Sequence, residues 1–209
     1  VGCGMGLNTF AAIKAGVQLR DKPLLPIWNC DTDARARTLI SAFTDTVCFG
    51  DFADTNPRKL RCPHVLVGTT DCRDMGRIGS RLGGLGPTGQ DFLSLPHWVV
   101  DLAPPIFICE TTADARFMHD GDDVTEAIDT LEAGGYVVHK SVLPCAAFLD
   151  ITSRQRLILF AKHRSMSNAA VPPRWPMPVQ KHAPPRLHDI MENDDDVPAG
   201  LWILCEYAP

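Results

Sequence analysis

A cysteine that follows a short apolar run is the first residue in this sequence that could carry covalent chemistry. Cys72 comes shortly after the run 65–67, and the glycine-rich stretch 76–89 follows it. In an α/β protein, sites form on loops at the carboxyl ends of buried strands, and a thiolate there is a strong nucleophile. We therefore expect Cys72 to be a nucleophile, with a loop cysteine of no chemical role as the alternative.

Three further residues could assist such a nucleophile. Glu110 ends the apolar run 106–109, at the expected sheet edge, and Arg154 and Arg156 stand at the start of a later apolar run. Alternate residues of a strand point to the same face, so the two arginines could hold a base carbonyl and a phosphate. The alternative is that all three are surface residues with no role in catalysis.

A glycine-rich turn with acids downstream is typical of a nucleoside site. Gly2-Cys3-Gly4-Met5-Gly6 precedes a predicted helix, and glycines let backbone amides approach a ligand, although the spacing differs from the dinucleotide fingerprint. Asp31-Thr32-Asp33 follows an apolar run, where an acid could bind ribose hydroxyls or cap a helix. Gly50-Asp51-Phe52 adds an acid and an aromatic ring that could flank adenine, so the three segments together suit S-adenosylmethionine.

The elements that must position these residues alternate along the chain. Apolar runs predict strands over 25–28, 64–67, 105–109, 136–142 and 157–161, and amphipathic stretches predict helices over 7–15, 32–43, 92–102 and 123–133. This alternation indicates an α/β fold with a doubly wound, mostly parallel sheet. The strand expected before the first glycine turn is largely missing, because the sequence starts at Val1, so we expect that residues before Val1 exist in the full protein or that the strand comes from elsewhere.

Composition narrows the classes of protein further. The net charge of −5 argues against strong nucleic-acid binding by the whole chain, so Arg73, Arg77 and Arg81 are a candidate local patch, with a solvated face as the alternative. The eight cysteines include no Cys-x-x-Cys pair, so we expect no metal site and favour reduced thiols in a nuclear or cytoplasmic protein. No apolar run reaches the roughly 20 residues of a membrane span.

In their order and spacing the motifs resemble those of the cytosine-5 DNA methyltransferases. The likeness runs from Val1 to about Ala161, with a weaker trace to about Glu192. The two nucleoside segments and the glycine turn are similar to the family's first three motifs. Its Pro-Cys-Gln, Glu-Asn-Val and Gln-x-Arg-x-Arg motifs resemble Asp71-Cys72-Arg73, Glu110-Thr111-Thr112 and Thr152-Ser153-Arg154-Gln155-Arg156.

The resemblance implies a Rossmann-like methyltransferase fold and methyl transfer to carbon 5 of cytosine in double-stranded DNA. Cys72 would add covalently to carbon 6 of a flipped-out cytosine, Glu110 would hold or protonate ring nitrogen 3, and Arg154 and Arg156 complete the catalytic set. The implied contacts of the cofactor S-adenosyl-L-methionine are Gly4, Met5, Gly6, Leu7, Asp31, Thr32, Asp51 and Phe52.

The likeness also implies a division of the chain. Residues 1–166 would form the cofactor-binding catalytic domain, and residues 167–209 a proline-rich linker and the start of a truncated target-recognition region. We therefore expect a fragment, or one subunit of a split enzyme whose second chain supplies target recognition.

Three departures from the family motifs keep rival interpretations open. Asp71 replaces a proline and puts a carboxylate beside the thiol, Thr111 replaces an asparagine that ties the glutamate strand to the cysteine loop, and Thr152 replaces a glutamine. The alternatives are an inactive homologue that acts as a regulatory or structural partner, and an RNA cytosine-5 methyltransferase.

Overall fold

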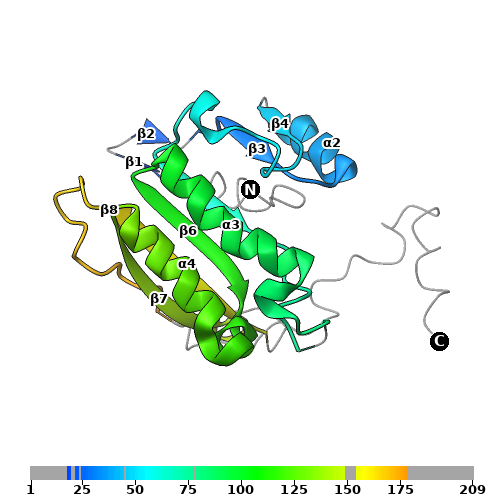
Figure 1. Ribbon diagram of the computed structural model, residues 1–209. Coiled ribbons are helices and arrows are strands. Elements are labelled where there is room, and N and C mark those ends of the chain that lie inside the picture. The colour runs from blue at the N-terminus through cyan, green and yellow to red at the C-terminus, as the bar shows by residue number, and fades with distance from the viewer. Residues whose placement is uncertain are drawn as a thin grey trace, which may run out of the picture. The chain divides into compact units, whose positions relative to one another are not determined.

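The computed structural model describes residues 18–19, 22–23, 25–44, 46–77, 79–148 and 154–177 (Figure 1). Nearly all of them belong to one compact unit, Val1–Leu143 with Gln155–Trp175, and the second unit is Pro144–Arg154 with Pro176–Pro209. The predicted helix over 7–15 and the cofactor contacts Gly4, Met5, Gly6 and Leu7 lie outside the described residues.

A four-stranded sheet forms the centre of the first unit. Its strands are β5 (Val65–Thr69), β6 (Ile106–Thr112), β7 (Tyr136–Pro144) and β8 (Gln155–His163), in the order β5-β6-β8-β7. β5 and β6 run parallel, whereas β6 and β8 run antiparallel. Along β6 every second residue is buried (Phe107, Cys109, Thr111), as expected for a strand with one face in the core.

Two helices lie side by side across one face of this sheet (Figure 1). They are α3 (Pro87–Leu102) and α4 (Asp122–Ala133), and their buried side chains include Leu95, Val99 and Leu131. α3 packs closely on β5 at Gly68, where an added Cβ would lie 2.8 Å from Leu95 Cδ2. Burial of these apolar faces holds the helices on the sheet.

A smaller parallel pair carries the acids that follow the first apolar run. β3 (Trp28–Cys30) and β4 (Val47–Phe49) pair in parallel and are joined by α2 (Ala34–Phe43), whose N-cap Asp33 accepts the Arg35 N–H at 2.8 Å. Trp28 packs edge-on against Trp98 of α3, with ring centroids 5.9 Å apart. Short elements complete the unit: β1 (Gln18–Leu19), β2 (Lys22–Pro23), and the 3-10 helices η1 (Pro57–Lys59), η2 (Gly83–Leu85) and η3 (Ala113–Gly121).

The α/β prediction is confirmed, with some shifted boundaries. The strand predicted over 25–28 is wrong except for its last residue, since Pro26 cannot donate a ladder hydrogen bond and β3 begins at Trp28. The helix predicted over 92–102 begins earlier, with Pro87 at its first position, where proline is favoured. In the described part of the chain, no helix is both long and apolar enough to cross a membrane.

Candidate active site

The carboxyl ends of β5 and β6 bring the predicted nucleophile loop and the predicted glutamate to one edge of the sheet. Thr69, the last residue of β5, is opposite Glu110 in the parallel register. The loop that holds Cys72 begins directly after Thr69. Ligands of α/β proteins bind outside the carboxyl ends of strands, so this edge is the candidate active site.

Glu110 is held by an arginine from the neighbouring antiparallel strand. Arg156 is opposite Thr112 in the β6–β8 register, so it reaches diagonally to Glu110 on the same face. Its Nε lies 2.5 Å from Glu110 Oε1, and the side chains are 19% and 33% exposed, respectively. The ion pair therefore holds the Glu110 carboxylate in a partly buried position, and part of the carboxylate stays accessible to solvent.

Cys72 is half-buried, free, and packed against the edge of the core. Its carbonyl accepts the Met75 N–H at 3.0 Å, which closes a turn just after the thiol. The other cysteine near the edge, Cys109, points into the core, where burial first and the Glu110 charge second raise the pKa of its thiol to about 12. A thiol held protonated is unreactive, so Cys72 is the nucleophile candidate of the two.

The carboxylate beside this thiol is paired. Asp71 Oδ1 accepts the Arg73 N–H at 3.0 Å, and Asp71 Oδ2 lies 2.7 Å from Arg73 Nε. The aspartate that stands in the place of the family's proline therefore closes a local turn, and an arginine balances its negative charge.

Asp74 organises the rest of the loop and ties it to α3. Its buried carboxylate accepts the Thr88 N–H at 2.8 Å, the Thr88 hydroxyl at 2.6 Å and the Ser80 hydroxyl, and its carbonyl accepts the Gly83 N–H at 3.0 Å. The hydrogen bonds from Ser80 and then Thr88 lower the pKa of Asp74 to about 2. Asp74 thus acts as an N-terminal cap of α3 and closes the loop on itself.

A second carboxylate, from the segment after β6, holds the near half of the loop. Asp114 Oδ2 accepts the Arg77 N–H at 3.3 Å, and Asp114 Oδ1 accepts Arg77 Nε–H at 3.1 Å. The residue lies just beyond Thr112, where β6 ends. The loop that carries Cys72 is therefore bonded to the continuation of the strand that carries Glu110.

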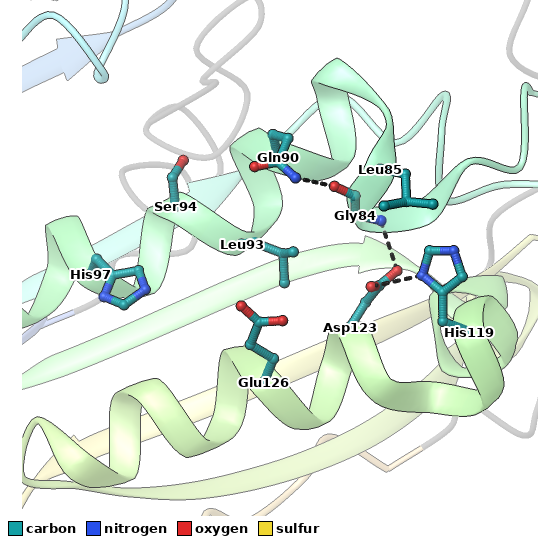
Figure 2. Close-up of a pocket in the computed structure, with 9 residues that line it drawn as sticks. All are labelled: Gly84, Leu85, Gln90, Leu93, Ser94, His97, His119, Asp123 and Glu126. Atoms are coloured by element: carbon teal, nitrogen blue, oxygen red, sulfur yellow. Dashed lines mark hydrogen bonds and ion pairs between the residues drawn. The ribbon is translucent and has the colours of Figure 1, made fainter.

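A third carboxylate, from α4, holds the far end of the loop (Figure 2). Asp123 Oδ2 accepts the Gly84 N–H at 2.8 Å, and Asp123 Oδ1 lies 3.0 Å from His119 Nδ1. Gly83 is needed here, because its φ of +52° is left-handed and a Cβ would overlap the Asp123 carboxylate. These groups border a pocket between α3 and α4 that is lined by Gly84, Leu85, Gln90, Leu93, Ser94, His97, His119, Asp123 and Glu126.

The described acids of the nucleoside segments also lie at the carboxyl ends of parallel strands. Asp31 follows β3 and accepts the Asp33 N–H at 2.9 Å, and Asp51 follows β4 and accepts the Ala53 N–H at 2.9 Å. Phe52 is only 7% exposed and packs edge-on against Trp98, so little of its ring is available to a ligand. Two carboxylates at the carboxyl ends of neighbouring parallel strands suit the hydroxyl and amino donors of a nucleoside.

The predicted arginines fall into different surroundings. β8 begins at Gln155, so the prediction that Arg154 and Arg156 alternate on a strand holds only for Arg156; Arg154 is exposed and belongs to the second unit. In the predicted basic patch, Arg73 and Arg77 are both paired with carboxylates. Arg81 is exposed, with a left-handed φ of 59°.

The fold and this edge define an α/β protein in which a cysteine-bearing loop begins opposite an arginine-held glutamate. The chain belongs to the C-5 cytosine-specific DNA methylase family, whose model matches residues 5–202. Family members take their methyl group from S-adenosylmethionine.

Individual relatives are distant. The chain is 24% identical over 162 residues to the type II methylase M.HgiDII of Herpetosiphon aurantiacus, covering 66% of this chain and 46% of that protein. It is 26% identical over 136 residues to the type II methyltransferase M.MspI of Moraxella sp., covering 65% of this chain and 32% of that protein. The chain thus spans less than half the length of both relatives.

Two solved structures share the fold. The S. pombe Dnmt2 methyltransferase aligns with a TM-score of 0.57 at 15% identity, covering 83% of this chain and 49% of that one. The Entamoeba histolytica methyltransferase EhMeth aligns with a TM-score of 0.58 at 13% identity, covering 77% and 51%. At these identities the likeness establishes the fold.

Proposed function

We propose that this chain is the catalytic part of an enzyme that methylates carbon 5 of cytosine in double-stranded DNA. The observation that carries the proposal is the meeting of the Cys72 loop and Glu110 at one sheet edge, with Glu110 held by Arg156. A second chain, or further sequence, would supply target recognition; residues 1–166 would form the catalytic domain, and residues 167–209 a proline-rich linker and the start of a truncated target-recognition region.

The chemistry begins at the thiol. The Cys72 thiol gives its proton to water, and the thiolate sulfur forms a bond to carbon 6 of the cytosine ring while the carbon 5–carbon 6 π bond breaks and its electron pair moves onto carbon 5 and, through carbon 4, towards nitrogen 3. Glu110 holds or protonates nitrogen 3, which accepts this electron density, and Arg156 keeps the glutamate in place. Carbon 5 then carries an electron pair that can attack an electrophilic methyl group.

S-adenosylmethionine supplies an electrophilic methyl group when it is bound. Asp31 and Asp51, at the carboxyl ends of β3 and β4, would accept hydrogen bonds from its hydroxyl and amino groups, and Thr32 lies between the first acid and α2. Gly4, Met5, Gly6, Leu7 and Phe52 complete the proposed contacts, with Phe52 largely buried. After transfer, water takes the carbon 5 proton, the carbon 5–carbon 6 double bond forms again, and the carbon 6–sulfur bond breaks to release the Cys72 thiolate.

The DNA contacts are proposed for the exposed side of the loop. A stacked base is out of reach of a thiol, so the cytosine must leave the helix, which costs a few kcal/mol. Arg81 is exposed there, while Arg73 and Arg77 are shared with Asp71 and Asp114. Arg154, which precedes β8, stays a proposed contact to the base or to a phosphate.

One observation favours a second candidate, an inactive homologue with a regulatory or structural role. The hydroxyl of Thr111, which stands in the place of the family's asparagine, is buried without a hydrogen-bond partner among the described residues. It therefore makes no hydrogen bond to the cysteine loop. An inactive homologue would still bind S-adenosylmethionine or its partner chain.

Product analysis separates the two candidates. The chain, alone and with any copurifying protein, is incubated with isotope-labelled S-adenosylmethionine and mixed-sequence duplex DNA, and the digested DNA is analysed by mass spectrometry. Labelled 5-methylcytosine supports the proposal. Cofactor binding by calorimetry without this product, from DNA or from RNA, would leave the inactive homologue.

A further inference from the structure

We propose that Asp114 and Arg77 are positioning residues that fix the Cys72 loop against the strand carrying Glu110. The inference deepens the proposed function and rests on it, since positioning matters only if Cys72 and Glu110 act on the same base. This ion pair lies outside the motifs that resemble those of the family, and we infer that it sets the spacing between Cys72 and Glu110.

The contact is made to the main chain as well as to a side chain. Both oxygens of Asp114 are used, one by the Arg77 N–H at 3.3 Å and one by Nε–H at 3.1 Å. A bond to the backbone restrains the path of the loop itself, five residues beyond Cys72 in the sequence. Asp114 is 25% exposed while Arg77 is 74% exposed, so the carboxylate is the better shielded partner.

No hydrogen bond from Thr111 performs this task. In the described part of the chain the hydroxyls of Thr70 and Thr111 are both buried and without hydrogen-bond partners. Each follows one of the register partners Thr69 and Glu110, the pair at which the β5–β6 register ends and after which the loop begins. The link between loop and strand is made instead by Arg77 and Asp114.

The residue that anchors the far end of the loop, Asp123, comes from the same stretch of chain as Asp114. Asp123 holds the Gly84 N–H at 2.8 Å and is itself bonded to His119, as Figure 2 shows. Asp114 and Asp123 lie in the segment that follows β6. The loop is therefore anchored at two points to the continuation of the glutamate strand, which restrains the position of Cys72 relative to Glu110.

A matched ion pair elsewhere provides the control. Arg58 Nη2 lies 2.7 Å from Asp101 Oδ1, with Arg58 again 74% exposed, and joins η1 to α3. Surface pairs of this kind contribute little to global stability. Losing either pair should therefore leave the protein folded, and only loss of the Asp114 pair should affect the loop.

The test compares Asp114→Ala, Arg77→Ala and the double variant with Asp101→Ala. Hydrogen exchange of peptides covering residues 73–86 is measured on the full chain, together with the rate of covalent trapping on 5-fluorocytosine DNA with S-adenosylmethionine. We expect faster loop exchange and a roughly ten- to hundredfold slower trapping rate in both single variants, with no change in Asp101→Ala. The double variant should match the single ones, because the two residues act as one unit.

Two further readouts separate positioning from DNA binding. Asp114→Asn keeps an oxygen that can accept the Arg77 N–H, so it should recover part of the trapping rate. Asp114→Ala frees the Arg77 charge, so DNA affinity should stay unchanged or rise while trapping slows.

Wild-type loop exchange in Asp114→Ala would overturn the inference, as would weaker DNA binding with an unchanged trapping rate. If the unsubstituted chain forms no trapped adduct, the proposed function fails. The exchange comparison would then still decide whether Asp114 restrains the loop.

Discussion

Arg156 reaches Glu110 diagonally across the antiparallel β6–β8 pair, with Arg156 Nε 2.5 Å from Glu110 Oε1. The carboxylate has no other bond among those described, so its direction depends on this arginine. The pair is the most direct structural support for a glutamate held ready for a ring nitrogen.

Replacing Arg156 should therefore disorder Glu110. In Arg156→Ala we expect trapping on 5-fluorocytosine DNA to slow roughly ten- to hundredfold, because the glutamate loses its fixed position. Arg156→Lys keeps the charge but not the planar donor geometry, so its trapping rate should lie between those of the unsubstituted chain and Arg156→Ala. Trapping kinetics measure the effect, with Arg58→Ala as the control; an unchanged rate in Arg156→Ala would remove the arginine from the mechanism.

Cys72→Ser should abolish methyl transfer and leave cofactor binding intact. A serine hydroxyl is a far weaker nucleophile at neutral pH, while the turn closed by the residue's carbonyl is retained. Labelled-product assays and calorimetry with S-adenosylmethionine check the two halves of the prediction. Undiminished product formation would show that another group attacks the base.

Asp71 is adapted to its place in the loop. Asp71→Asn keeps an acceptor for the Arg73 N–H and should retain most activity, whereas Asp71→Pro loses that bond and the ion pair and should lower activity. Initial rates of methylation distinguish the variants. A faster Asp71→Pro enzyme would mean that the restraint supplied by a proline matters more than the bonds seen here.

Asp74 should stabilise the fold through its cap on α3. Asp74→Ala removes the acceptor for Thr88 and Ser80, so we expect the melting temperature to fall by about 2–4 °C, while Asp74→Asn should lose less. The pKa of Asp74 is lowered from 3.8 to about 2, so its contribution is present above pH 3.8 and is lost as pH falls through about 2. Thermal unfolding of the unsubstituted chain and of both variants across acidic pH measures this contribution. A melting temperature of Asp74→Ala equal to that of the unsubstituted chain at pH 6 would contradict the capping role.

His119 should add a pH-dependent contribution to stability. The hydrogen bond to Asp123, and then the charge of Asp123, raise the pKa of His119 above its ordinary value of 6.5, with smaller contributions from Asp122 and Asp120. A raised pKa means that the contribution is complete below pH 6.5 and is lost as pH rises through the raised value. The melting-temperature difference between the unsubstituted chain and His119→Gln should therefore shrink as pH rises from 6; a difference that grows would contradict this.

The sequence predicted the strands of the central sheet well, because β6 and β8 contain the continuous apolar runs 106–109 and 157–161. β4 was missed, since three residues carry too little pattern. Glu110 and Arg156 could both be named from motif spacing, but their bond depends on antiparallel register between distant segments.

The loop anchors gave no such signal. Asp74, Asp114 and Asp123 are ordinary aspartates in the sequence, and their roles arise from contacts 14 to 39 residues away. The nearest local hint was Asp74 ahead of the Gly-Pro-Thr segment that starts α3, which is compatible with a cap.

The central claim is the covalent step at Cys72, and trapping tests it most directly. Duplex DNA containing 5-fluorocytosine is incubated with S-adenosylmethionine and the chain, together with any copurifying protein, and the adduct is mapped by mass spectrometry with Cys72→Ser as the control. A stable adduct on Cys72 that is absent from Cys72→Ser is the predicted result. No adduct despite measured cofactor binding, or an adduct on a different cysteine, would contradict the account.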